Sequence, residues 1–186
     1  SGQDYPIKSR EQIDRYLAGL DGASLIHNDP FPVEFWHDGG WGRIQQFHMH
    51  DRPRWVRGVV RAANASPLRR RYPRGLHPHG GAQFWAMSHT AVKYVLDFVD
   101  RNPKFVRYYR RTLIPDEGFF QTILGNAGDA VRRENDCINH LEWDRPGMVL
   151  TGDDFATLAQ THYLFARKFD SRVDSAVLDR IDRELL

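Results

Sequence analysis

Apolar residues recur at helical spacing near both ends of the chain. Ser9 and Gln12 form a capping box, so a helix is predicted to begin at residue 10. The apolar residues that follow share one face of that helix: Ile13, Tyr16, Leu17 and Leu20. The final stretch repeats the pattern at strict four-residue spacing: Val173, Val177, Ile181 and Leu185. Both ends of the chain are therefore predicted to form amphipathic helices.

The sharpest patterns lie in the middle of the chain. Residues 82–87 are mostly apolar and predict a buried strand, and Ser88 is placed to cap the helix that follows. That helix is expected to turn one apolar face to the core: Val92, Val95, Leu96 and Val99. Pro103 ends it and opens a second helix over residues 103–111. Pro115, a residue suited to a first helical position, predicts a third helix.

The remaining stretches are less regular. Residues 23–26 predict a short strand, and Thr151 begins a further helix. Residues 55–60 fit either a strand or the start of a helix, and their spacing leaves both open. Residues 28–55 are rich in Pro, Gly and aromatic residues, and residues 61–81 have the composition of a loop. Strand and helix patterns alternate along the chain, so the predicted fold class is mixed α/β.

Composition narrows the class of protein. The 186 residues are 27% charged and 41% hydrophobic, which is typical of one soluble globular domain and excludes a disordered chain. The formal net charge of +2 does not by itself indicate a nucleic-acid partner. No apolar run approaches the roughly 20 residues that a membrane span needs. Cys137 is the only cysteine, so an internal disulfide is impossible and a reducing compartment is favoured.

Histidine and arginine clusters suggest two kinds of site. His48 and His50, and likewise His77 and His79, have the spacing of paired metal ligands, yet no third ligand follows at a recognisable distance. Loop histidines are the simpler interpretation. The run Arg69–Arg71 could bind an anion, although a solvated loop face also explains it.

Three further features are compatible with carbohydrate chemistry. Aromatic residues that could stack on sugar rings, or simply pack in a core, crowd one stretch: Phe31, Phe35, Trp36, Trp41, Phe47 and Trp55. Glu117 is suited to the first turn of a helix, where its negative charge interacts favourably with the helix dipole. At a cleft, however, it could act as a general base. Lys168 lies between Phe165 and Phe169, and it could either face solvent or meet a diphosphate.

Four sequence blocks are more specific than these single features. SGQDYPIKS spans Ser1–Ser9, and GAQFWAMS spans Gly81–Ser88. LIPDEGFFQTIL at Leu113–Leu124 is the most specific block, and LFARKFD at Leu164–Asp170 is the last. In this order they resemble the core-2/I-branching β-1,6-N-acetylglucosaminyltransferases and the related peptide O-xylosyltransferases. Residues 28–80 match that family poorly and are expected to set the acceptor.

The resemblance implies a fold, a reaction and a set of residues. The implied fold is the acceptor-side C-terminal portion of a GT-A-like glycosyltransferase. It consists of a mixed sheet with flanking helices and covers residues 1–186 as a single domain portion. The reaction is an inverting, metal-independent transfer of GlcNAc or xylose from a UDP-sugar to a hydroxyl of a glycan or protein, with no cofactor and no nucleic acid. Glu117 is the implied general base, and Lys168 is the implied diphosphate-binding cation, with Arg167 as its rival. The other implied substrate-binding residues are Arg145, Trp143, Asp116, Trp85 and Asp4.

The chain also departs from the family pattern. The nucleotide-recognising half that precedes the first block in the family is absent here, so the isolated chain is expected to show little or no transfer. The absence of the family's disulfides indicates a bacterial relative, cytoplasmic or peripheral to a membrane. The alternative is a non-catalytic carbohydrate-binding module that uses the aromatic stretch 31–55, with Glu117 only a helix-start residue.

Overall fold

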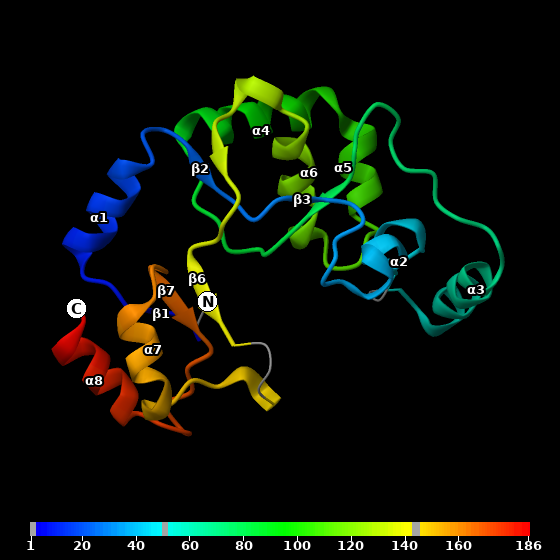
Figure 1. Ribbon diagram of the computed structural model, residues 1–186. Helices are drawn as coiled ribbons and strands as arrows, with labels where there is room; N and C mark the ends of the chain where they lie inside the picture. The colour runs from blue at the N-terminus through cyan, green and yellow to red at the C-terminus, as the bar shows by residue number, and fades with distance from the viewer. Residues whose placement is uncertain (1–2, 50–51, 143–145) are drawn as a thin grey trace. The chain divides into compact units, whose positions relative to one another are not determined.

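The computed structural model describes residues 3–49, 52–142 and 146–186. Its contacts divide the chain into two compact units (Figure 1). The central unit is Ala23–Asp136, and the terminal unit combines Ser1–Gly22 with Cys137–Leu186. The expectation of a single glycosyltransferase domain portion over residues 1–186 stays a prediction.

The terminal unit is built on a three-stranded sheet. Its strands are β1 (Tyr5–Pro6), β6 (Asn139–Leu141) and β7 (Phe165–Arg167), and β7 lies between the other two (Figure 1). Strand β7 is antiparallel to β1 and parallel to β6. The helices are α1 (Arg10–Gly19), α7 (Phe155–Gln160) and α8 (Ala176–Glu184). This arrangement confirms the predicted mixed sheet with flanking helices.

Helix α1 follows its predicted cap but not its predicted face, and α8 follows part of its predicted face. The Ser9 hydroxyl accepts from the Gln12 amide, and the Gln12 side chain accepts from the Ser9 amide, which confirms the capping box. However, no residue of α1 is buried. In α8, Val177 and Ile181 are buried as predicted, whereas Val173 precedes the helix and is exposed. The apolar core of this unit therefore comes mainly from α7, α8 and the sheet.

The central unit contains two small two-stranded sheets and most of the helices. Strand β2 (Ser24–Leu25) is parallel to β5 (Arg133–Glu134), and β3 (Asp29–Pro30) is antiparallel to β4 (His79–Gly80). The helices are α2 (Trp41–Gln45), α3 (Arg54–Ala65), α4 (His89–Arg101), α5 (Pro103–Tyr109) and α6 (Phe119–Gly125). Helix α6 contacts α4, β3 and β4, and its Ile123 and Leu124 are fully buried. The core of this unit therefore lies around α6.

Several predictions for the central unit need correction. Residues 82–87 do not form a strand: Ala86 makes one isolated bridge to Leu25, and the Ala82 carbonyl accepts from the Gln121 side chain instead of a strand partner. The third helix does not begin at Pro115, because Gly118 separates a 3₁₀ turn from α6. The open choice at residues 55–60 resolves to a helix, α3.

Helix α4 confirms one prediction and partly contradicts another. The Ser88 hydroxyl accepts from the Ala91 amide at 3.3 Å, so Ser88 is the N-cap. Of the predicted apolar face, Val95 is buried, while Val92 and Leu96 are exposed. Ala91 takes the buried position one turn earlier, so the face that packs is rotated from the predicted one.

Candidate active site

Glu117 ends a tight turn that the local sequence explains. Ile114 adopts a left-handed conformation (φ 47°, ψ 63°), Pro115 opens the 3₁₀ turn Pro115–Glu117, and Gly118 ends it. The Gly81 amide donates to the Glu117 carbonyl at 3.0 Å, which ties the turn to the segment after β4. The Glu117 side chain is 19% exposed. It is therefore fixed at its base and still reachable from solvent.

Arg43 is the partner of Glu117, and the sequence patterns did not identify it. Its Nη1 donates to Glu117 Oε2, and the two residues are 74 positions apart in the chain. The guanidinium carbon of Arg43 lies 3.8 Å from the ring centroid of Trp36, a cation–π contact that holds the arginine in place. The only signal in the sequence was an arginine inside an aromatic-rich stretch.

The aromatic stretch divides into a cluster near this pair and two outliers. Phe31 packs edge-on against Trp36 and Trp41, with ring centroids 5.7 and 5.4 Å apart. Phe35 contacts Trp36 at 6.0 Å and is 60% exposed. The outliers are Phe47, near Arg70, and Trp55, on α3. Four of the six predicted aromatic residues therefore gather around Trp36, the ring that contacts Arg43, and Phe35 is exposed to solvent.

Glycines allow the backbone to approach this cluster closely. A Cβ at Gly80 would lie 2.3 Å from the Trp36 ring, and one at Gly81 would lie 2.0 Å from the His27 carbonyl oxygen. A side chain at either position would push β4 away from its neighbours. The two glycines therefore let the backbone at residues 80–81 come close enough for the Gly81 amide to bond to the Glu117 carbonyl.

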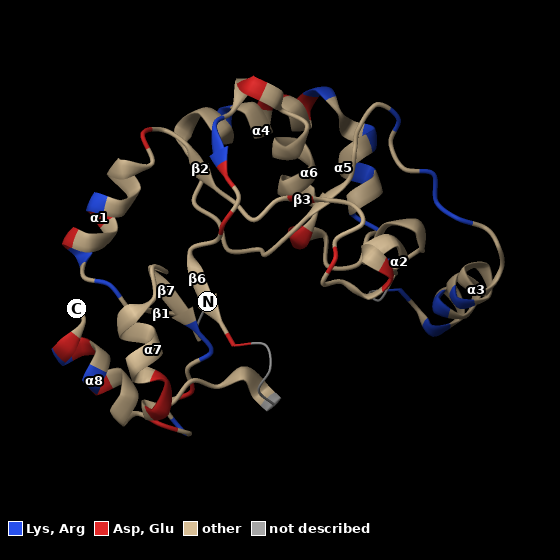
Figure 2. Cartoon of the chain, viewed as in Figure 1, with Lys and Arg blue, Asp and Glu red and all other residues tan. Residues whose placement is uncertain are grey.

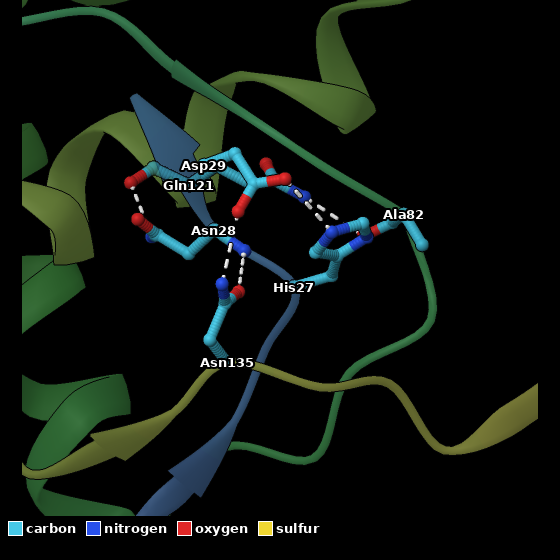
Figure 3. Close-up of polar contacts among 6 residues, drawn as sticks. All are labelled: His27, Asn28, Asp29, Ala82, Gln121 and Asn135. Carbon is cyan, nitrogen blue, oxygen red and sulfur yellow. Dashed lines mark hydrogen bonds and ion pairs between the residues drawn. The ribbon is translucent and has the colours of Figure 1, made fainter. Parts of the chain in front are cut away.

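A network of polar side chains is hydrogen-bonded to the segment that follows β4, at Ala82 (Figure 3). Gln121 is fully buried and donates to the Ala82 carbonyl at 2.9 Å, while Asn28 donates to the Gln121 carbonyl at 2.7 Å. Asn135 accepts from the Asn28 amide and donates to Asp29, whose carboxylate also contacts His27 at 3.0 Å. The network joins β3, α6 and the segment after β5, so it stiffens the frame that holds Glu117.

His79, in β4, is a half-buried histidine held in its neutral form. Burial, and secondarily the charge of Arg133, lower the pKa of His79 to about 4. Its Nδ1 is buried and has no hydrogen-bond partner within the described residues. In the unfolded chain the ring takes up a proton as the pH falls through about 6.5, whereas in the folded chain it stays neutral down to about pH 4.

The free energy of unfolding is therefore expected to fall by about 2 kcal/mol between pH 7.5 and pH 5 because of His79. Urea denaturation at both pH values measures this difference. His79→Gln should remove this part of the pH dependence, and His77→Gln, a change at an exposed neighbour, should keep it. An unchanged pH dependence in His79→Gln would contradict this explanation.

The terminal unit holds the predicted cations. Arg167 Nη1 lies 3.3 Å from Asp4 Oδ1, and both side chains are about four-fifths buried (18% and 20% exposed). The backbone of Lys168 is bonded on both sides, donating to Met148 at 3.1 Å and accepting from Leu150 at 2.8 Å. Across residues 3–49, 52–142 and 146–186, the Lys168 ammonium has no ion-pair partner. Lys168 is therefore better placed than Arg167 to meet a ligand's charge.

The other predicted site residues have different surroundings. Asp116 is exposed and lines an apolar surface hollow of about 300 Å³ together with Tyr109, Phe119 and Phe120. Trp85 packs edge-on against Phe120, with ring centroids 5.1 Å apart, at the margin of the core. The predicted residues Trp143 and Arg145 lie outside the described residues.

The histidine pairs do not gain ligands from the fold. Wherever the structure describes side chains, no three His, Cys, Asp or Glu residues are grouped as a metal site requires. His50 lies outside the described residues, and His48 contacts the Gly42 carbonyl. The residues therefore give no support to the metal interpretation, and metal-independent chemistry stays a prediction.

Comparison with known proteins agrees with the sequence blocks. The family model described as Core-2/I-Branching enzyme matches residues 1–158. The chain is 36% identical to beta-glucuronosyltransferase GlcAT14B of Arabidopsis thaliana over 112 residues, which are 57% of this chain and 25% of that protein. It is 26% identical to xylosyltransferase 2 of Homo sapiens over 206 aligned residues, which cover 100% of this chain and 22% of that protein. The chain thus spans about a quarter of the length of these curated relatives.

Proposed function

Because the chain belongs to the Core-2/I-branching enzyme family, we propose that it is the acceptor-side part of an inverting, GT-A-like glycosyltransferase. The reaction moves a sugar from a UDP-sugar to a hydroxyl group of a glycan or protein. The observation that carries the proposal is Glu117, anchored through its turn and through Arg43, which contacts Trp36, and still partly exposed to solvent.

Glu117 is proposed as the general base. Arg43 engages Oε2, while Oε1 has no hydrogen-bond partner in the described part of the chain, so this oxygen is open to an acceptor hydroxyl. The hydroxyl proton passes to Glu117 as its oxygen attacks the anomeric carbon from the face opposite UDP. The bond from that carbon to the UDP oxygen breaks, its electron pair leaves with the diphosphate, and the anomeric configuration inverts.

Lys168 is proposed to stabilise the departing diphosphate. Negative charge grows on the leaving oxygen in the transition state, and a fixed cation there lowers the barrier. Arg167 is engaged by Asp4, whereas the Lys168 ammonium is open to such a ligand. Asp116, Trp85 and Asp4 are proposed to support substrate binding, along with Trp143 and Arg145. The predicted donors are UDP-GlcNAc and UDP-xylose, and the glucuronosyltransferase relatives add UDP-glucuronate as a third candidate.

The proposed reaction needs no metal ion, which gives a prediction. Transfer is measured in a joined protein, in which this chain follows the nucleotide-recognising half of a family member. With excess EDTA, the rate of UDP release in the presence of donor and acceptor is expected to stay within about twofold of the untreated rate, because cationic side chains perform the metal's role. Loss of activity with EDTA and its recovery with added Mn²⁺ would contradict metal independence.

The second candidate function is a non-catalytic carbohydrate-binding module. The observation in its favour is the exposed ring of Phe35, stacked on His27 at 5.4 Å, which resembles a platform for a sugar face. Isothermal titration of the 186-residue chain with glycans and with UDP distinguishes the two. Glycan binding without UDP binding, together with a joined protein that shows no transfer, would favour the module.

A further inference from the structure

Helix α3 has no role in the proposed reaction, and none of its 12 residues is buried. Helical spacing nevertheless gives it two distinct sides. The apolar side is formed by small and large apolar residues: Trp55, Val56, Val59, Val60, Ala62 and Ala63. The polar side is formed by Arg54, Arg57, Arg61 and Asn64. A helix with this pattern normally buries its apolar side against the protein.

In this structure Asn64, on the polar side, is hydrogen-bonded to the central unit, while Arg54, Arg57 and Arg61 are exposed. The Asn64 side chain accepts from the Phe47 amide and donates to the Phe47 carbonyl, both at 2.9 Å. A hollow of about 700 Å³ beside residues 46–49 is lined by Arg57, Arg61 and Asn64 and also by Val60. Part of the apolar side points outward: Trp55 is 74% exposed, and Val59 is 64% exposed one turn later, whereas Val56 and Val60 are partly buried. An exposed apolar face of this kind marks a docking surface.

The charge around α3 indicates what it docks on. Between Asp51 and Asp97 the chain has nine Lys and Arg residues and no Asp or Glu, which leaves 17 basic against 24 acidic residues in the rest of the sequence. Figure 2 shows this separation: α3 and the loop after it carry blue segments and no red ones. Arg69 and Arg71 in that loop are exposed. The partner surface is therefore expected to be anionic.

We propose that α3 and the basic loop 66–74 dock on an anionic lipid bilayer. An amphipathic helix with Trp on its apolar side and Arg on its polar side lies in the plane of the membrane interface, with the apolar side among the acyl chains. Helix α3 is about 18 Å long, too short to cross a bilayer, and no described helix has both the length and the apolar character to do so. A nucleic acid would be bound through the exposed arginines alone and would leave Trp55 and Val59 uncovered, whereas a bilayer engages both kinds of side chain. The proposal is independent of the transfer reaction.

Flotation of the 186-residue chain with lipid vesicles tests the proposal. The chain is expected to float with vesicles of phosphatidylcholine and phosphatidylserine at low salt, and to stay unbound with phosphatidylcholine alone. The double substitution Trp55→Ser/Val59→Ser should lower the partition coefficient about tenfold or more by removing the inserted apolar area. Arg57→Gln and Arg61→Gln should each lower it about fivefold. Both sets of residues are exposed, so the fold is expected to tolerate them.

Val92→Ser/Leu96→Ser is the matched control, because both residues are exposed apolar positions on α4. It should leave the partition coefficient within about twofold of the unsubstituted chain. No binding to anionic vesicles, or equal losses in the α3 and α4 variants, would overturn the proposal. A dimer in sedimentation velocity that the Trp55→Ser/Val59→Ser variant dissociates would also overturn it, since a second copy would then cover the face.

Discussion

Replacing Glu117 with glutamine is expected to lower the rate of sugar transfer by the joined protein about 10²- to 10⁴-fold. The amide has the size of the carboxylate, and its oxygen can still accept from Arg43, so the local geometry is kept. It cannot take a proton from the acceptor hydroxyl near neutral pH, so the loss should appear in kcat. The measurement is the initial rate of UDP release at saturating donor and acceptor.

The control for this substitution is Glu11→Gln. Glu11 is an exposed residue in the first turn of α1, and its loss is expected to leave the transfer rate within about twofold. A Glu117→Gln rate close to that of the control would show that another group removes the proton. Glu117 would then be a structural partner of Arg43, and the binding-module interpretation would gain weight.

Replacing Lys168 with methionine is the second change for which we expect a large effect, a decrease in transfer of about 10²- to 10³-fold. Methionine keeps most of the apolar length of the lysine stem, so packing is disturbed little. The charge that would stabilise the leaving diphosphate is removed. Transfer rate and inhibition by added UDP are measured together, because the same charge should strengthen UDP binding.

Lys104→Met, at an exposed position in α5, is the control and should leave both quantities unchanged. The alternative, that Arg167 is the diphosphate-binding cation, is tested by replacing Arg167. Removing Arg167 would leave the mostly buried Asp4 without this cation, so Arg167→Met is expected to reduce stability first. If Lys168→Met kept its activity while a folded Arg167→Met lost it, Arg167 would take the role proposed for Lys168.

Local signals in the sequence predicted local structure well. The predicted caps at Ser9 and Ser88, and the helix start predicted at Thr151, depend on hydrogen bonds between residues three apart, so their spacing can be read directly. The strand predicted at residues 82–87 does not form, because a contact with a residue distant in the sequence replaces the expected strand pairing. The buried side chain of Gln121, in α6, donates a hydrogen bond to the Ala82 carbonyl, and no local sequence pattern predicts that contact.

The candidate active site also has a part that local sequence predicts and a part that depends on tertiary contacts. The sequence block located Glu117 and its turn, but its partner Arg43 is 74 residues away and meets it only after folding. Helix α3 gives the clearest case. The spacing of residues 55–60 left strand and helix open, and in the helix that forms Asn64 bonds to Phe47 while Trp55 stays exposed. Periodicity identifies the two sides of a helix, but only tertiary contacts decide which one is covered.

The configuration of the product tests the proposed reaction most directly. UDP-sugar donors carry the sugar in an α linkage, and a single displacement with Glu117 as base inverts that configuration. Proton NMR of the first product formed by the joined protein should therefore show a β-linked sugar. An α-linked product would mean net retention, which a single displacement from the opposite face cannot give, and it would contradict the inverting reaction proposed for Glu117.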